Sequence, residues 1–391
     1  MLSGNIILLL YRAANMKRWN DHIRPPGFTE LEKQAQKMTI AYTMGHLEEQ
    51  QIDWIYLIKR GFYEFLQRVI VTDINPRIYN RIKSENPVQL RNFVIERLVE
   101  ENVDKRIIDE MQDTLYPDTI TESESFVKKL LEAASVLATW WEFKIIYDFN
   151  RQLSGIDKTL EKIEMRLEDH YSLIGVQKIL LKKKSYRFID ICGQLRHQIR
   201  WAQTNRVPET TVLGHSIIVA YMAYLGTRDF TDNPNQVYNN FFCGLFHDLP
   251  EVMTGDVISP VKNRIEGLSD VLREIEISDI QEHILPLLPK SLARDLRFFL
   301  IDDGDEFTNK VRQQSSEKDD DMLDGQFLEL CDKFAAYIEA KLSIYYGLRS
   351  IELEQGIKRM SDKYREREYN LFAFDKLFDE IDKKLSIDKE L

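Results

Sequence analysis

The sequence consists mainly of long amphipathic segments that glycine and proline seldom interrupt. Its 391 residues include 16 glycines and 11 prolines. Apolar side chains recur at three- and four-residue spacing, as in HSIIVAYMAYLG, residues 215–226, whose apolar stripe includes His215. A β-sheet would need alternating strands and frequent turn signals, which are almost absent. The pattern therefore predicts an all-α fold.

Length and composition restrict the class of protein further. A chain of 391 residues exceeds what one core usually needs, so two domains are expected. Hydrophobic residues make up 43% and aromatic residues 11%, which favours a globular protein over a disordered one. The net charge of −11 opposes broad attraction to nucleic acid or to an anionic membrane, so neither is an expected partner. A small anionic substrate in a locally basic pocket remains compatible.

Cysteine usage and the first residues point to a cytoplasmic protein. Cys192, Cys243 and Cys331 show no CxxC spacing and cannot all pair, which favours a reducing compartment. The apolar run NIILLL, residues 5–10, is too short to span a bilayer and precedes no small-residue cleavage site.

The chain contains an internal repeat. Arg18-Trp19 matches Arg200-Trp201, and residues 60–82 align with residues 243–265 so that Asp73 falls opposite Asp256. A third, weaker match pairs residues 133–144 with residues 329–341. We therefore predict two copies of one helical domain, residues 1–150 and 186–391, joined by a connecting helix over 151–185.

The two copies differ at the positions that could bind a metal. The aligned pairs are Lys33 with His215, Glu64-Phe65 with His247-Asp248, and Ser135 with Asp332. Only the second copy is therefore expected to hold a metal ion.

Four residues of the second copy form the candidate ligand set: His215, His247, Asp248 and Asp332. Two imidazoles and two carboxylates suit Mn²⁺, Co²⁺, Fe²⁺, Zn²⁺ or, less readily, Mg²⁺. The competing interpretation is structural, because a histidine on an apolar face is more often a core residue and Asp332 alone could be an internal cap. The acidic run SSEKDDDMLDG, residues 315–325, is interpreted as a solvated loop rather than a metal site.

Further polar residues lie close to these candidates in sequence. Glu251 follows Asp248 by three residues, so on a helix it would share that face and could serve in proton transfer. Asp256 follows a Thr-Gly pair, where a turn could direct its carboxylate to a sugar hydroxyl. Arg200 offers a fork for phosphate, and Trp201 a stacking or packing surface.

The ordered pattern H…HD…D resembles the HD-domain metal-dependent phosphohydrolases. The stretch HDLPEVMTGDVISPVK, residues 247–262, is similar to the YfbR-like branch, the 5′-nucleotidases that act on deoxyribonucleoside monophosphates. The resemblance covers about residues 186–350 and implies an all-α HD fold. It also implies a set of metal ligands, namely His215, His247, Asp248 and Asp332. The catalytic residues would be Glu251 and Asp248, and the substrate contacts would be Arg200, Trp201 and Asp256. Gly214 stands where the family usually has a glutamate.

The leading hypothesis is a phosphohydrolase that removes the 5′-phosphate of a (deoxy)ribonucleoside monophosphate by in-line attack of metal-bound water. One alternative substrate is a nucleoside triphosphate or a signalling nucleotide. Another alternative is a non-catalytic regulatory HD module. We also predict that the first copy is a permanent inactive partner of the second, a pseudo-dimer within one chain, with further homo-oligomers left open.

Overall fold

The computed structural model confirms the all-α prediction. It describes residues 1–72, 74, 76–256, 265–301, 323–369 and 372–386. Among these residues, the only strands are β1 (Glu368–Tyr369) and β2 (Phe372–Ala373), which pair antiparallel. The acidic run is described only from residue 323 onwards, so its interpretation as a solvated loop falls mostly outside the described residues, as does Asp73.

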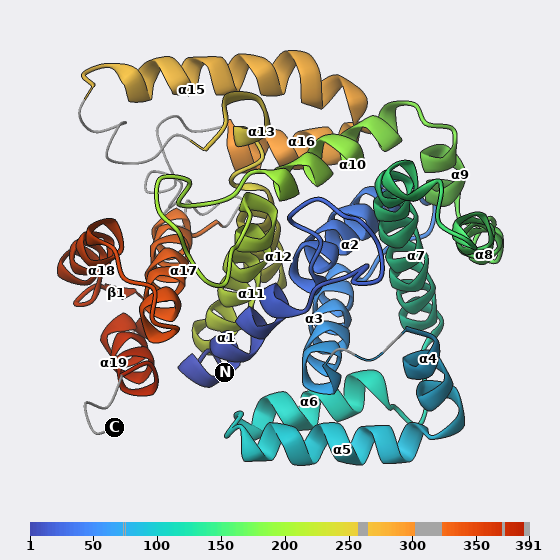
Figure 1. Cartoon of the computed structure of the whole chain (residues 1–391), viewed down its shortest axis with the longest axis horizontal. Helices are drawn as coiled ribbons and strands as arrows, with labels where there is room; N and C mark the ends of the chain where they lie inside the picture. Colours follow the sequence, from blue (N-terminus) through green and yellow to red (C-terminus); the bar gives the residue numbers. More distant parts are fainter. Residues whose placement is uncertain (73, 75, 257–264, 302–322, 370–371, 387–391) are drawn as a thin grey trace.

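The helices of the first half and of the connection surround the long helix α2 (Figure 1). Their bounds are α1 (Gly4–Tyr11), η1 (Arg12–Asn15), α2 (Glu30–Gly45), α3 (Trp54–Val71), α4 (Pro76–Glu85), α5 (Pro87–Glu100), α6 (Lys105–Leu115), α7 (Glu122–Asn150), α8 (Ile156–Glu168), α9 (Ile174–Leu180), α10 (Lys184–Gln194) and η2 (Leu195–His197). The predicted single connecting helix is thus two helices, α8 and α9, followed by the start of α10. The domain boundaries themselves stay a prediction.

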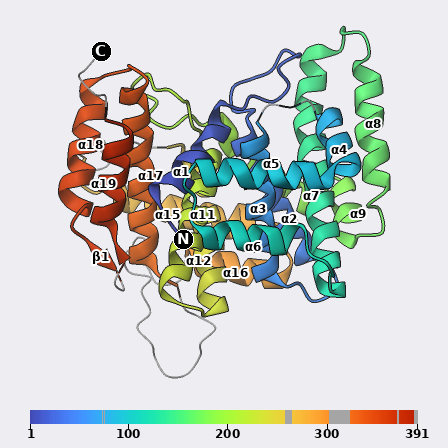
Figure 2. The same cartoon turned by 90° about the horizontal axis from the view of Figure 1, so that it is seen from below.

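The helices of the second half are grouped around α11. Their bounds are α11 (Val212–Phe230), α12 (Pro234–Phe246), α13 (Glu251–Thr254), α15 (Leu268–Asp279), the π-helical turn η3 (Ile280–Ile284), η4 (Leu285–Leu287), α16 (Lys290–Leu300), α17 (Gly325–Tyr345), α18 (Ile351–Tyr364) and α19 (Phe374–Lys384). In Figure 2, α17, α18 and α19 form one flank of the molecule, and α7 and α8 form the opposite flank.

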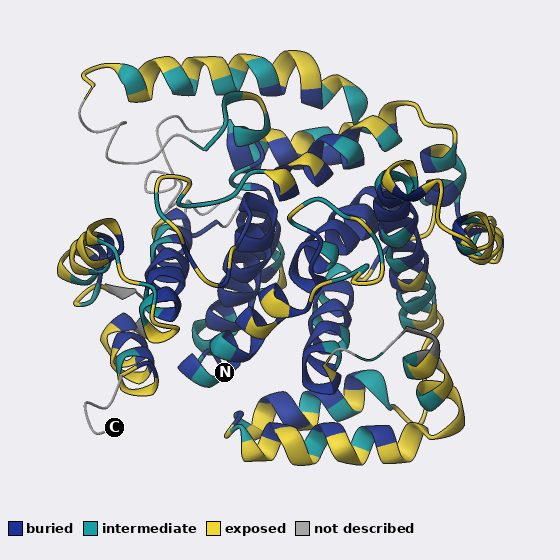
Figure 3. Ribbon diagram, viewed as in Figure 1, coloured by how far each residue is buried: buried dark blue, intermediate teal, exposed yellow. Residues whose placement is uncertain are grey.

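Two buried helices, α2 and α11, form the centre of the molecule (Figure 3). Residues 212–227 of α11 are all buried. In α2, every residue except Lys33 is buried. α11 is mostly apolar all round, as expected of a helix inside a core, whereas α2 also buries polar side chains such as Glu32 and Gln36. A single hydrophobic core includes residues of both halves. The described helices include none that is long and apolar enough to cross a membrane.

The two central helices start in the same way. A threonine caps each N-terminus: Thr29 forms a capping box with Glu32, and Thr211 accepts a hydrogen bond from the backbone N–H of Gly214. Each capping threonine also forms an isolated β-bridge with an earlier residue, Thr29 with Lys17 and Thr211 with Ile199. The loop between the two bridge residues therefore returns the chain to the helix start in both halves.

The first turns of α2 and α11 also contact each other at Gly214, where the HD-domain phosphohydrolases usually have a glutamate. Glu32 Oε1 accepts a hydrogen bond from Thr211 Oγ1 at 3.0 Å. A Cβ added at Gly214 would lie 2.7 Å from that same carboxylate oxygen and 3.1 Å from a Leu31 methyl carbon. Because Glu32 is held by hydrogen bonds and fully buried, Gly214 leaves the space that this carboxylate occupies.

We predict that Gly214→Ala lowers the free energy of unfolding by about 1–3 kcal/mol, because the new methyl group overpacks against Glu32. Urea denaturation measures the effect. In a Glu32→Ala background the same substitution should cost at least about 0.5 kcal/mol less, because its obstacle has been removed. A Gly214→Ala protein as stable as the parent would contradict this contact.

Candidate metal centre

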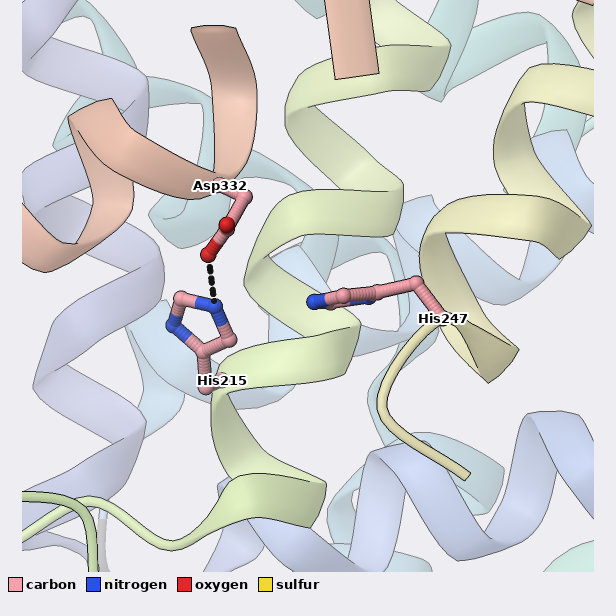
Figure 4. A group of neighbouring side chains, drawn as sticks. All are labelled: His215, His247 and Asp332. Atoms are coloured by element: carbon pink, nitrogen blue, oxygen red, sulfur yellow. Dashed lines mark hydrogen bonds and ion pairs between the residues drawn. The ribbon is translucent and has the colours of Figure 1, made fainter. Parts of the chain in front are cut away.

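Three side chains that could ligate a metal meet between α11, α12 and α17 (Figure 4). The group consists of His215, His247 and Asp332, and one ligand atom from each lies within 4.8 Å of the others. His215 lies in the first turns of α11, His247 directly follows α12, and Asp332 lies on α17. The structure thus brings three of the four predicted ligands within reach of one ion. No other group of this kind occurs among the described residues.

Hydrogen bonds orient both histidine rings in the manner typical of metal ligands. His247 Nδ1 lies 2.7 Å from the Gly244 carbonyl oxygen, and His215 Nδ1 lies 3.3 Å from Glu339 Oε1. A carbonyl oxygen can only accept, so His247 Nδ1 donates to it and carries a proton. Glu339 favours the same Nδ1–H tautomer of His215. Outer partners of this type are what fix metal-binding imidazoles.

The pocket between His215 and Asp332 favours positive charge. His215 Nε2 lies 2.9 Å from Asp332 Oδ1, and Lys333 donates to Asp332 Oδ2 at 2.7 Å. Burial alone would lower the pKa of His215, but the hydrogen bonds to Asp332 and Glu339 raise it. Burial would raise the pKa of Asp332, yet Lys333 and His215 hold it well below its usual value. A divalent cation meets the same electrostatic demand.

Asp248 borders this group without being part of it. Its Oδ2 lies 3.0 Å from His247 Nε2 and 3.6 Å from Arg200 Nη1. Burial opposes ionisation of Asp248, but the charges of His247 and Arg200 lower its pKa. The fourth predicted ligand therefore adjoins a ligand atom, and its coordination of the metal stays a prediction.

Glu339 is the functional residue that the sequence analysis missed. This carboxylate is fully buried and accepts hydrogen bonds from Arg200 Nε at 3.3 Å, Trp201 Nε1 at 3.0 Å and Thr210 Oγ1 at 2.8 Å. It follows Asp332 on α17 by seven residues, which is two helical turns and the same face. That spacing was the signal that could have identified it.

Trp201 packs against α18 and is already hydrogen-bonded. Its backbone has φ 61°, and a Cβ at Gly356 would lie 2.7 Å from its ring carbon Cη2. With its N–H on Glu339, the indole holds the loop that carries Arg200. The predicted packing role is compatible with this placement, and substrate contact by Trp201 stays a prediction.

The segment after His247 differs from the predicted continuous helix. α12 ends at Phe246, and a turn leads into α13, in which the Glu251 N–H donates to the Asp248 carbonyl at 3.1 Å. The turn forms before Pro250, which lacks an N–H and so cannot continue a helical ladder. The Glu251 carbonyl accepts from Gln198 at 2.9 Å, which ties this segment to the Arg200 loop.

Asp256 lies just beyond α13, after Gly255 with φ 75°. Burial alone would lower the pKa of Arg200, but four carboxylates raise it. They are Glu339, Asp248, Asp332 and Asp256. Asp256 therefore interacts electrostatically with Arg200. The predicted contact of Asp256 with substrate stays a prediction.

The first half contains a matching centre with different side chains. Arg18 Nε and Trp19 Nε1 both donate to Glu142, at 2.8 and 3.0 Å, as Arg200 and Trp201 do to Glu339. Trp19 also has a positive φ of 57°. Lys33 follows its cap by four residues, as His215 does. Ser135 precedes Glu142 by seven residues, as Asp332 precedes Glu339. These parallels support the alignment on which the predicted repeat rests.

The comparison with protein families identifies the second half. Residues 192–361 match the family model described as an HD domain. This matched segment, which is less than half of the chain, is called the HD domain below. The match includes both histidines, Asp248 and Asp332, and it starts just before the Arg200 loop. The predicted H…HD…D pattern is therefore that of an HD domain with a candidate divalent metal site.

Curated relatives are similar to part of this chain. A protein named 5′-deoxynucleotidase from Vibrio cholerae is 25% identical over 181 residues, which cover 45% of this chain and 82% of the relative. One from Pasteurella multocida is 24% identical over 170 residues, or 42% and 77%. One from Yersinia pestis is 30% identical over 105 residues, or 26% and 52%. No solved structure gives a significant match.

Lys33 generates a prediction about stability and pH. Burial, with Arg18 beside it, lowers the pKa of Lys33 from 10.5 to about 7. Between these values the unfolded chain holds a proton that the folded chain lacks, so this group adds stability as pH rises from about 7 towards 10.5. Below pH 7 both states are protonated and the full cost of the buried ammonium remains.

Lys33→Met should therefore raise the melting temperature by about 2 °C or more at pH 6 in phosphate-free buffer. The gain should shrink by pH 9.5, where the native lysine is neutral. Lys17→Met changes an exposed lysine before α2 and should have no such effect. Differential scanning calorimetry measures the melting temperature of each variant at both pH values. An unchanged melting temperature of Lys33→Met at pH 6 would contradict the destabilising effect of the Lys33 ammonium.

Proposed function

We propose that this protein is a metal-dependent phosphohydrolase that removes the 5′-phosphate from deoxyribonucleoside monophosphates. The observation that carries the proposal is the meeting of two imidazoles, each with Nδ1 held by an acceptor, and the Asp332 carboxylate inside an HD domain. The name 5′-deoxynucleotidase of the curated relatives supports the substrate class. The fold alone would not assign this chemistry.

The metal ligands in this proposal are His215, His247 and Asp332, with Asp248 as the fourth. Mixed nitrogen and oxygen donors are compatible with Mn²⁺, Co²⁺, Fe²⁺ or Zn²⁺, and less so with Mg²⁺, which prefers oxygen ligands. When bound, such a cation supplies a nucleophilic water near neutral pH and neutralises charge on a phosphoryl oxygen.

Arg200 would bind the substrate phosphate in this proposal. Its Nε is bound to Glu339, while its Nη1 lies at 3.6 Å from Asp248 and so faces the ligand group. Arginine suits this task because its planar fork matches two phosphate oxygens. Trp201 would act with Glu339 to hold that fork, and Asp256 would accept a hydrogen bond from the sugar.

Proton transfer would fall to Glu251, with Asp248 beside the ligand group. Glu251 lies one turn beyond Asp248, and its backbone is tied to the Arg200 loop through Gln198. A half-buried carboxylate placed there is suited to proton exchange with the attacking water or the leaving oxygen.

The first half would serve as a built-in, metal-free partner of the HD domain. The contact of Glu32 with Thr211 and the hydrogen bond from Gln34 Nε2 to the Tyr221 hydroxyl, 2.5 Å long, join the two central helices. We extend the proposal to the domain limits 1–150, 151–185 and 186–391, and to a cytoplasmic location. Further self-association of the chain is compatible with it.

Removal of the metal or of a ligand should abolish phosphate release. We expect EDTA to reduce the rate at least 100-fold and Mn²⁺ or Co²⁺ to restore it. Asp332→Ala and Asp248→Ala should lose activity to a similar extent, and the retained metal should be measured by mass spectrometry. Ser135→Ala, at the matching position of the first half, should keep both metal and activity. An active Asp248→Ala enzyme would refute the proposed site.

A substrate panel separates this proposal from its alternatives. Deoxyribonucleoside monophosphates should release orthophosphate with a higher kcat/KM than nucleoside triphosphates do. Release of pyrophosphate or triphosphate, without orthophosphate from any monophosphate, would instead indicate a triphosphate or signalling nucleotide. A purified protein that no divalent cation activates would favour the non-catalytic regulatory module.

A further inference from the structure

The centre of the first half holds more basic than acidic side chains. Three ion-paired carboxylates lie in it, and each is bound by two basic groups. Glu30 pairs with Arg18 and Arg68, Glu64 with Lys37 and Arg60, and Glu142 with Arg18 and Arg196. Each of these three carboxylates therefore already binds two basic side chains.

Lys33 adds a further cation that none of these carboxylates binds. Among the described residues, its ammonium has no hydrogen bond or ion pair, although it feels the charges of Glu30 and Glu142. Its pKa of about 7 reflects burial beside Arg18 rather than compensation by an acid. Arg196 contributes in the same way, because its Nε and Nη2 are buried without an acceptor in the described part of the chain. Six basic side chains thus face four carboxylates, namely the three ion-paired ones and the buried Glu32, which interacts with Arg196.

The HD domain has the opposite balance at the matching place. There, three basic side chains face four carboxylates, because Arg206 acts on Glu339 and Asp256 acts on Arg200 in addition to the ion pairs of Arg200 and Lys333 with Asp248, Asp332 and Glu339. A divalent cation would change this deficit of positive charge into an excess and so prepare the pocket for a phosphate dianion. In the first half, side chains alone provide the excess.

The first-half centre is about as open as the metal centre. Lys33 is the only residue of α2 that is not fully buried. The side chains of Arg68 and Glu64 are 16% and 19% exposed, against 16% and 11% for Asp248 and Asp332. Side chains of both centres are therefore partly exposed to a similar degree.

We propose that the first-half centre binds a phosphate dianion without a metal, with the Lys33 ammonium as its main contact and the guanidinium groups of Arg18 and Arg68 as supports. The ligand is the phosphate group itself, either as free orthophosphate or as part of a nucleoside monophosphate. The centre lacks the histidine and carboxylate ligands of the HD domain, so the bound phosphate is retained and not hydrolysed. This inference is independent of the proposed enzyme activity, because no metal takes part in it.

The test is binding of orthophosphate to the full chain in EDTA, measured by isothermal titration calorimetry at pH 6.5 in a buffer without other multivalent anions. We expect one saturable site per chain, with Kd below about 1 mM. Lys33→Met should weaken binding at least tenfold, and Lys33→Arg should retain most of it. Lys17→Met should leave it unchanged. Calorimetric melting of each variant confirms that it is folded.

Two further ligands identify the source of the phosphate. A deoxyribonucleoside monophosphate that binds at least tenfold tighter than orthophosphate, through the same Lys33-dependent site, indicates a nucleotide ligand. Equal affinity indicates free orthophosphate. The proposal is overturned if neither ligand binds below about 10 mM, if Lys33→Met binds as the parent does, or if the nucleoside without phosphate binds as tightly.

Discussion

Glu339 is a fully buried carboxylate, and the arrangement of the metal centre depends on it. It accepts hydrogen bonds from Arg200, Trp201 and Thr210 and favours the Nδ1–H tautomer of His215. A buried carboxylate is costly unless such partners compensate it. Burial would raise the pKa of Glu339, but Arg200 and the other partners hold it well below its usual value, so it stays charged. One side chain thus positions the phosphate-binding candidate and a metal-ligand candidate together.

A buried glutamate that binds an Arg-Trp pair occurs in both halves of the chain. Glu142 holds Arg18 and Trp19 as Glu339 holds Arg200 and Trp201, so both halves have the same loop geometry around a buried acid. Around Glu339 the matching positions carry metal-binding groups, whereas around Glu142 they carry Lys33, Glu64-Phe65 and Ser135. Arg196 connects the two centres, because it is bound to Glu142 and lies four residues before Arg200.

The all-α fold and three metal-binding candidates could be predicted because their signals are periodic or spaced along the chain. His215 and Asp332 lie on buried helical stripes, and the adjacent His247-Asp248 pair completes a recognisable order. The two-helix connection and the turn after His247 were not predicted, because helix ends depend on local hydrogen bonds that periodicity does not register.

Contacts between distant side chains could not be predicted in the same way. The spacing from Asp332 places Glu339 on the same helix face, but its role depends on partners 124 to 139 residues away. The absence of a glutamate at position 214 was visible in the sequence. That the Glu32 carboxylate lies against Gly214 depends on how α2 and α11 pack, which the sequence does not show. The excess of charge around Lys33 is a property of six basic residues from four segments, and no single motif reveals it.

The most direct test of the metal centre is a crystal structure of the protein soaked with Mn²⁺, with anomalous scattering recorded near the manganese edge. We expect one strong anomalous peak per chain, in contact with His215 Nε2, His247 Nε2 and an Asp332 oxygen, and none at the first-half centre beside Lys33. A fully soaked crystal without a peak between these three side chains, or with its strongest peak beside Lys33, would contradict the assignment of the metal to the HD domain.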